Sequence, residues 1–208
     1  MAQHPDNQAA NQNEPSNARA AQMLDAQSDE NRVLDSSEEH RAEAPRDVRV
    51  FVLTVSDTRN EINDASGNLI QELLAQAGHQ LVGSLIVSDE APAISEAVHR
   101  ATDGISDPEA IIVTGGSGIG VRDVSPEALR PMLTKELPGF GEVFRVLSYE
   151  EIGAAAMLSR AFAGVMGRTL LFVLPGSTSA VRLAMKKLIV PELGHLVREL
   201  RPERREKS

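Results

Sequence analysis

The chain has 208 residues, and its 41% of hydrophobic residues suffices for the buried core of one domain. The absence of cysteine excludes disulfides and thiolate metal sites, and a net charge of −9 with one tyrosine and no tryptophan argues against nucleic acid as a partner. We recognise neither a signal peptide nor a run of about 18 apolar residues, so we expect a cytoplasmic protein that does not span a membrane.

Residues 1–46 differ in composition from the remainder of the chain. They are rich in Asn, Gln, Ala, Asp and Glu, and they contain neither Gly nor Phe. Only Leu24, Val33 and Leu34 are large branched apolar side chains, too few to offset the entropy that ordering would cost. We therefore predict a disordered acidic N-terminal tail over 1–46, with an interaction arm as the alternative, and a folded domain over 47–208.

The folded part begins with a run of β-branched residues at 48–56, which is typical of a strand buried on both faces of a parallel sheet. A helix is expected to follow from Ser66, as its N-cap, to Gln76. The next expected elements are a strand over 81–87, a helix over 92–102 and a third buried strand over 110–114.

The second half continues the same alternation. Its expected elements are a short helix over 126–133, a helix over 153–163, a buried strand over 169–175 and two helices over 177–188 and 191–200. Alternating strands and helices predict an α/β fold with a doubly wound, parallel sheet and helices on both faces. In such sheets ligands bind beyond the carboxyl ends of the strands, so the loops that follow the strands are the candidate site.

The loop after the third strand reads TGGSGIG and is the richest of these loops in glycine. Glycines let successive backbone N–H groups approach an anion with no Cβ in the way, and Ser117 adds a hydroxyl donor. A tight turn that needs only positive φ is the alternative. A Walker A lysine is missing, and Val121 breaks the G-x-G-x-x-G spacing, so P-loop GTPases and Rossmann dehydrogenases are disfavoured.

The LPGS segment after the fourth strand is a second candidate for phosphate binding. It places Gly176 and Ser177 at the N-terminus of a predicted helix, where free N–H groups and the helix dipole favour an anion. Simple N-capping by Ser177 is the alternative. Two anion sites on one sheet edge suit a ligand with two phosphate clusters, or two phosphorylated ligands.

Asp57, Asp89 and Asp123 each lie in one of the loops that follow a strand. Carboxylates beside phosphate sites usually share a Mg²⁺ with the phosphates. Loop capping, or a salt bridge with Arg59 or Arg122, is the alternative. The five histidines show no metal-ligand spacing, so we do not expect them to bind a metal.

Several of these segments together resemble the MoaB/Mog family of molybdenum cofactor biosynthesis proteins. They are TVSDTR, VSDE, TGGSG with RDVSPEA, PGFGEVFR at 138–145, and LPGST. The resemblance covers roughly residues 48–199. It implies a three-layer αβα sandwich with a mostly parallel central sheet, assembled as a homo-trimer or homo-hexamer. The interface candidates in this chain are Phe140, Val143, Phe144 and Val146.

The resemblance also implies an activity. Active members of the family bind molybdopterin and Mg-ATP, and transfer AMP to the terminal phosphate of the pterin with release of pyrophosphate. On this basis the expected catalytic and metal-binding residues are Asp89 and Asp123. The expected substrate-binding residues are Ser56, Asp57, Thr114, Gly115, Gly116, Ser117, Gly118, Pro175, Gly176 and Ser177. Arg59 and Arg122 are candidates for countering charge, and transient contact with other molybdenum cofactor enzymes is expected.

Two features of the sequence leave alternatives open. Ser117 stands where the family usually has Thr, a change that keeps the hydroxyl. RDVSPEA resembles the adenylyltransferase branch, whereas FGEVFRVLSYEEIGAAAMLSRAFAGV resembles the MoaB branch, some members of which are inactive. The alternative function is therefore a non-catalytic molybdopterin-binding or carrier protein. Another Mg²⁺-dependent nucleotide enzyme is the third hypothesis.

Overall fold

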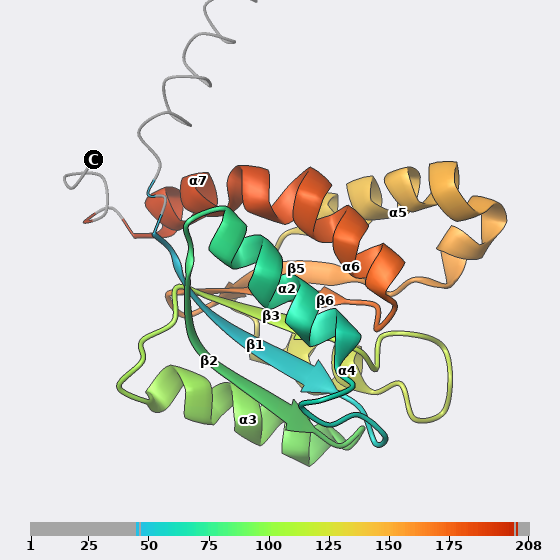
Figure 1. Ribbon diagram of the computed structural model, residues 1–208, viewed down its shortest axis with the longest axis horizontal. Helices are drawn as coiled ribbons and strands as arrows, with labels where there is room; N and C mark the ends of the chain where they lie inside the picture. Colours follow the sequence, from blue (N-terminus) through green and yellow to red (C-terminus); the bar gives the residue numbers. More distant parts are fainter. Residues whose placement is uncertain (1–44, 46, 202, 204–208) are drawn as a thin grey trace, which may run out of the picture. The chain divides into compact units, whose positions relative to one another are not determined.

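A six-stranded sheet carries the fold in the computed structural model, which describes residues 45, 47–201 and 203 (Figure 1). The strand order is β2-β1-β3-β6-β5-β4. The strands are β1 (Arg49–Val55), β2 (Gln80–Val87), β3 (Ala110–Thr114), β4 (Lys135–Glu136), β5 (Phe162–Met166) and β6 (Thr169–Leu174). The pairs β1–β2, β1–β3 and β3–β6 are parallel, whereas β5 pairs antiparallel with both β6 and β4. The prediction of a mostly parallel α/β sheet is confirmed.

Helices cover both faces of this sheet. They are α2 (Ala65–Gln76), α3 (Ala91–Asp103), α4 (Ser125–Leu129), α5 (Pro138–Ile152), α6 (Thr178–Ala184) and α7 (Val190–Leu200). Helices α2, α5, α6 and α7 pack on one face, and α3 and α4 on the other (Figure 1). The three layers expected from the family resemblance are present.

The central strand β3 is buried along its whole length and feeds two separate hydrophobic cores. Ala110 and Ile112 face the core under α2, α6 and α7, and Ile111 and Val113 face the core under α3 and α4. Each fully buried Val or Ile contributes about 1.5–3 kcal/mol. The apolar run in the sequence is continuous because both faces of β3 are buried. The loop after β3 therefore starts from a strand that is packed on both sides.

The prediction of a helix over 153–163 is wrong. Gly153 adopts a φ of 62° and ends α5, and the residues after it form a 3-10 helix, η2 (Gly153–Leu158). Residues 162–166 then form β5 instead of continuing a helix. The helix in this region is α5, which the sequence pattern did not predict because glycines occupy its first turns. Packing of Phe144 in the core overrides that low helix propensity.

Three helix boundaries also differ from the prediction. The N-cap of α2 is Asp64, whose carboxylate accepts from the Gly67 N–H at 3.0 Å, and Ser66 lies inside the helix. The short helix α4 ends at Leu129, and Pro131 follows within a 3-10 turn, η1 (Arg130–Met132). The two C-terminal helices are joined by a π-helical turn, η3 (Met185–Ile189), in place of a break. Such a turn accommodates the missing N–H of Pro191.

The predicted tail over 1–46 lies outside the described residues, apart from residue 45, and its disorder and boundary stay predictions. Within the part of the chain that the structure describes, no helix has the length and apolar character needed to cross a lipid bilayer.

Candidate functional site

Two of the predicted anion loops touch one another at the carboxyl ends of β3 and β6. We call them the glycine loop (residues 114–120) and the PGS loop (residues 175–177). The Thr114 hydroxyl donates to the Pro175 carbonyl oxygen at 3.1 Å, and the Gly115 N–H donates to the Leu174 carbonyl oxygen at 3.1 Å. A Cβ on Gly176 would lie 3.3 Å from the Gly115 Cα, so any larger residue there would require the two loops to move apart by a few tenths of an ångström.

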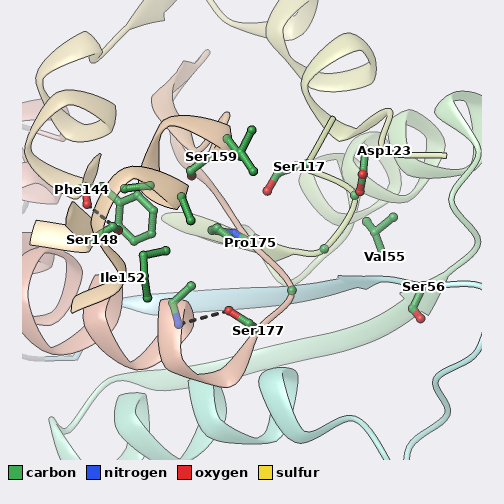
Figure 2. Close-up of a pocket in the computed structure, with 18 of the residues that line it drawn as sticks. Val55, Ser56, Ser117, Asp123, Phe144, Ser148, Ile152, Ser159, Pro175 and Ser177 are labelled. Carbon is green, nitrogen blue, oxygen red and sulfur yellow. Dashed lines mark hydrogen bonds between the residues drawn. The ribbon is translucent and has the colours of Figure 1, made fainter. Parts of the chain in front are cut away.

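A cavity of about 510 Å³ lies over these two loops, within the usual size of a small-molecule site. Its lining includes most of the predicted binding residues: Ser56, Gly115, Gly116, Ser117, Gly118, Asp123, Pro175, Gly176 and Ser177. Figure 2 shows Phe144, Ser148 and Ile152 on one side of the cavity and Ser56 and Asp123 on the other. The cavity therefore has a polar floor and an apolar wall.

Within the glycine loop, the carbonyl oxygens of residues 115–118 accept hydrogen bonds from Ser125 and Arg160. Ser125 holds the Gly115 carbonyl with its hydroxyl and the Gly116 carbonyl with its N–H, both at 2.9 Å. Arg160 holds the Ser117 carbonyl with its N–H at 3.4 Å and the Gly118 carbonyl with Nε at 2.7 Å. In contrast, the N–H groups of residues 116, 117 and 118 have no acceptor among the described residues. Free donors with fixed carbonyls make a preformed anion site.

The PGS loop shows the same asymmetry. The Pro175 carbonyl accepts from Thr114, and the Gly176 carbonyl accepts from Arg59 Nη2 at 2.8 Å. The N–H groups of Gly176 and Ser177 have no acceptor within the described ranges. The Ser177 hydroxyl caps α6 by accepting from the Ala180 N–H at 3.4 Å, the dashed contact in Figure 2. Ser177 therefore caps α6 with its hydroxyl while its backbone N–H, within the described part of the chain, remains free for an anion. From the sequence alone, N-capping and anion binding are alternatives.

Arg59 is fixed by a buried carboxylate that sequence reasoning missed. Asp64 accepts hydrogen bonds from the Thr54 hydroxyl at 2.5 Å, the Ser66 hydroxyl at 3.2 Å and Arg59 Nη1 at 3.3 Å. Arg59 also contacts the Ser66 hydroxyl. This network links the loop after β1 to the PGS loop and places one guanidinium at the cavity. The Asp-x-x-Gly spacing of an N-cap was the signal that could have identified Asp64.

Asp57 and Asp89 lie beside the glycine loop but outside the lining of the cavity. Each backbone N–H donates to the carboxylate of the other, at 3.0 and 3.1 Å, so the loops after β1 and β2 are joined. Arg122 makes two hydrogen bonds to Asp57, at 2.8 and 3.1 Å, and one to Glu90 at 3.2 Å. Of the two arginines considered for charge compensation, Arg59 lines the cavity and Arg122 does not.

The acidic side chains around the glycine loop differ in their proton affinity. Hydrogen bonds from Arg122 hold the pKa of Asp57 below its usual range. Burial raises the pKa of Asp89, and the negative charges of Asp57 and Asp123 act in the same direction. A cation beside Asp89 would therefore favour the ionised form of its carboxylate.

The residues present fit a magnesium ion that is shared with a phosphate. A Cβ on Gly116 would lie 3.2 Å from Asp89 Oδ1, and one on Gly118 would lie 2.7 Å from Asp123 Oδ2, so both carboxylates border the loop. The Oδ1 atoms of Asp89 and Asp123 accept no hydrogen bond from any described residue. No cluster of three metal-ligating side chains occurs among the residues described. Mg²⁺ typically uses one or two carboxylates, waters and substrate phosphates, which this donor set can supply.

The apolar wall of the cavity was missed by sequence reasoning. Phe144 and Ile152 come from α5, and Ala156 and Leu158 from η2. Since the sequence pattern placed no helix over α5, it could not bring these side chains to the sheet edge. An apolar surface opposite two candidate anion-binding loops is suited to the ring of a phosphorylated heterocycle.

Comparisons with known proteins agree with this geometry. Residues 51–195 match a family described as a probable molybdopterin binding domain. Molybdenum cofactor biosynthesis protein B of Halalkalibacterium halodurans is 52% identical over 170 residues, which cover 81% of this chain and 99% of that protein. A crystal structure of a molybdenum cofactor biosynthesis protein B has a TM-score of 0.74 at 49% identity, covering 76% of this chain and 99% of that one. The tungsten cofactor synthesizing protein MoaB from Pyrococcus furiosus has a TM-score of 0.68 at 38% identity, with the same coverage.

Proposed function

This chain belongs to the MoaB/Mog family of molybdenum cofactor biosynthesis proteins, and we propose that it binds molybdopterin and Mg-ATP and transfers AMP to the terminal phosphate of the pterin. The observation that carries the proposal is the contact between two anion-binding loops in one cavity, with carboxylates at its border. Two phosphorylated substrates can lie side by side there, which is what transfer between them requires.

In the proposed reaction an oxygen of the pterin phosphate attacks the α-phosphorus of ATP. The bond from that phosphorus to the oxygen bridging to the β-phosphate breaks, and pyrophosphate leaves with the bonding electron pair. The attacking group is already an anion, so a strong general base is not needed. Rate acceleration then depends on alignment and on neutralising charge.

Backbone N–H groups and side chains have different roles in aligning the substrates and neutralising their charge. The free N–H groups of residues 116–118 and of Ser177 hold phosphate oxygens. Asp89 and Asp123 would hold Mg²⁺, which supplies positive charge to the phosphates. Arg59 adds a fixed positive charge at the PGS loop. The exposed part of the apolar wall, which includes Ile152 and Leu158, orients a heterocycle above them.

The decisive experiment incubates the protein with molybdopterin, ATP and Mg²⁺ and measures adenylated molybdopterin and pyrophosphate. Asp123→Asn keeps the size of the side chain and an acceptor for the Gly120 N–H but removes the charge. We expect this variant to bind the pterin and lose turnover. Asp103→Asn, at the exposed end of α3, is the matched control and should keep full activity. Absence of adenylated product with the unaltered protein would refute the proposed transfer.

Calorimetry separates the enzyme from the carrier alternative. An enzyme of this kind binds both molybdopterin and Mg-ATP, whereas a carrier binds the pterin alone. Nucleotide turnover without pterin would instead support a different Mg²⁺-dependent nucleotide enzyme.

A homo-trimer or homo-hexamer is part of the proposal, and an exposed apolar surface on α5 and η2 supports it. Its residues are Val143, Val146, Tyr149, Ile152, Met157 and Leu158. Two of the expected interface residues, Val143 and Val146, belong to this surface. Phe144 does not, because it is buried in the core of the subunit, and Phe140 packs against that core. Light scattering of Val146→Glu should show smaller particles than the unaltered protein; equal mass would remove this surface from the interface.

A further inference from the structure

Arg160 lies in the segment that resembles the MoaB branch, but the proposed reaction does not use it. Its side chain contacts two points of the site, Gly118 and Asp123. It lies between η2 and β5, and its guanidinium is partly buried. Nε donates to the Gly118 carbonyl and Nη2 to the Asp123 carbonyl, each at 2.7 Å. Its backbone N–H adds a third contact, to the Ser117 carbonyl at 3.4 Å.

Glu127, in the first turn of α4, holds the remaining part of this guanidinium. Its carboxylate pairs with Arg160 Nη1. The hydrogen bond from Arg160 lowers the pKa of Glu127, so the pair is charged at neutral pH. The guanidinium therefore forms an ion pair with Glu127 on one side and donates hydrogen bonds to the backbone carbonyls of Gly118 and Asp123 on the other.

Peptide geometry turns these contacts into an orientation of the anion donors. In a trans peptide the C=O of one residue and the N–H of the next point in opposite directions. The backbone N–H of Arg160, bonded to the Ser117 carbonyl, thus fixes where the Gly118 N–H points. The side-chain bond from Nε to the Gly118 carbonyl fixes the N–H of Ile119, and with it the conformation of the loop that carries the donors of residues 116–118. Glycine-rich backbone rotates easily, and a rotated peptide would present a carbonyl dipole to the phosphate in place of a donor.

We infer that Arg160 is a positioning residue that keeps the glycine loop in its anion-binding conformation and places the backbone of Asp123. It acts through backbone carbonyls and not by contact with the ligand. The inference rests on the proposed function only for the identity of the ligand, since any phosphate compound would need the same donors. Arginine is required because its planar fork reaches two carbonyls at once, which a lysine ammonium on a flexible stem cannot do in the same geometry.

The test compares Arg160→Lys with Arg100→Gln, a matched change at an exposed arginine in the last turn of α3. Calorimetry with inorganic pyrophosphate and with Mg-ATP gives the affinities. Hydrogen–deuterium exchange reports how often the loop opens, because the amides of Gly120, Asp123 and Ser125 are hydrogen-bonded in the closed loop and exchange when these bonds break. For Arg160→Lys we expect about tenfold weaker binding of both ligands and faster exchange confined to these amides. Arg100→Gln should change neither.

The inference is overturned if Arg160→Lys binds pyrophosphate as tightly as the unaltered protein does, or if the exchange of the loop amides is unchanged. A positive charge at this position, without the two hydrogen bonds of an arginine, would then be enough to keep the loop in place. If the unaltered protein binds neither anion, the inference is also overturned. Pyrophosphate binding that depends on Arg160, without ATP binding, would uphold the inference and reject the proposed function. Should Arg160→Lys fail to fold, Glu127→Gln replaces it: weaker pyrophosphate binding supports the inference and unchanged binding overturns it.

Discussion

Replacing Gly115 by alanine tests whether backbone conformation and close packing together create the glycine loop. Gly115 has a φ of 105°, and a Cβ at this position would overlap the Val55 carbonyl oxygen. Two other glycines separate these effects. Gly153 has a φ of 62° but no atom within 4 Å of a built Cβ, and Gly139 has neither a positive φ nor a close neighbour.

The expected cost of Gly115→Ala follows from the contacts that must give way. The backbone conformation costs an alanine about 1–3 kcal/mol. Relief of the overlap with Val55 moves the loop and weakens two hydrogen bonds, Gly115 N–H to Leu174 and Ser125 hydroxyl to the Gly115 carbonyl, worth about 1 kcal/mol each. The free energy of unfolding should therefore fall by about 3–5 kcal/mol. Gly153→Ala should lose only the conformational cost of about 1–3 kcal/mol, and Gly139→Ala should lose nothing.

Urea unfolding of the three variants, followed by circular dichroism, measures these differences. Pyrophosphate titration of the folded proteins shows the effect on the site, where Gly115→Ala alone should lose binding. The reasoning fails if Gly115→Ala is no less stable than Gly153→Ala, because the overlap with Val55 would then have no energetic consequence.

Four further predictions concern the carboxylates and their arginine partners. Because burial raises the pKa of Asp89, this residue takes up a proton at a higher pH than an ordinary aspartate. Mg-ATP affinity measured by calorimetry should therefore begin to fall on acidification before an ordinary aspartate is protonated, and Asp89→Asn should lack that fall. The same shift means that ionised Asp89 lowers stability above its pKa, so Asp89→Asn should not lower the melting temperature at neutral pH. Asp64→Asn removes a buried partner of Arg59 and should lower the free energy of unfolding by about 3 kcal/mol in urea, whereas Asp103→Asn should not. Arg122→Gln breaks only exposed ion pairs, so its unfolding free energy should change by less than about 1 kcal/mol.

The position of the glycine loop and the PGS loop was predictable from the sequence. It depends only on the local sequence of the strands and on the rule that the loops after adjacent parallel strands lie at the same edge of the sheet. Buried apolar runs predicted β1, β3 and β6, and these three strands are neighbours in the sheet. The carboxyl ends of adjacent parallel strands meet at one edge, so the glycine loop and the PGS loop had to lie close together. The structure adds which backbone groups are free, a property that depends on donors elsewhere in the chain.

The remaining parts of the site depend on contacts between distant residues. Arg160 holds the carbonyls of Gly118 and Asp123 from 42 and 37 positions away, and Arg59 reaches Gly176 over 117 positions. Residue patterns carry no sign of such pairings. The apolar wall was missed for a different reason: the glycines in the first turns of α5 conceal a helix that is held by packing against the sheet.

The two halves of the cavity are built by different parts of the topology. The glycine loop and the PGS loop follow β3 and β6, which are parallel neighbours, whereas the apolar wall comes from α5 and η2, inserted before the antiparallel strand β5. Arg160 follows η2 in the same inserted segment and bonds to the glycine loop, so this segment both shapes the apolar wall and positions the loop. Substitutions at Ile152 or Leu158 can therefore change the surface offered to a ring system only where the contacts of Arg160 are kept.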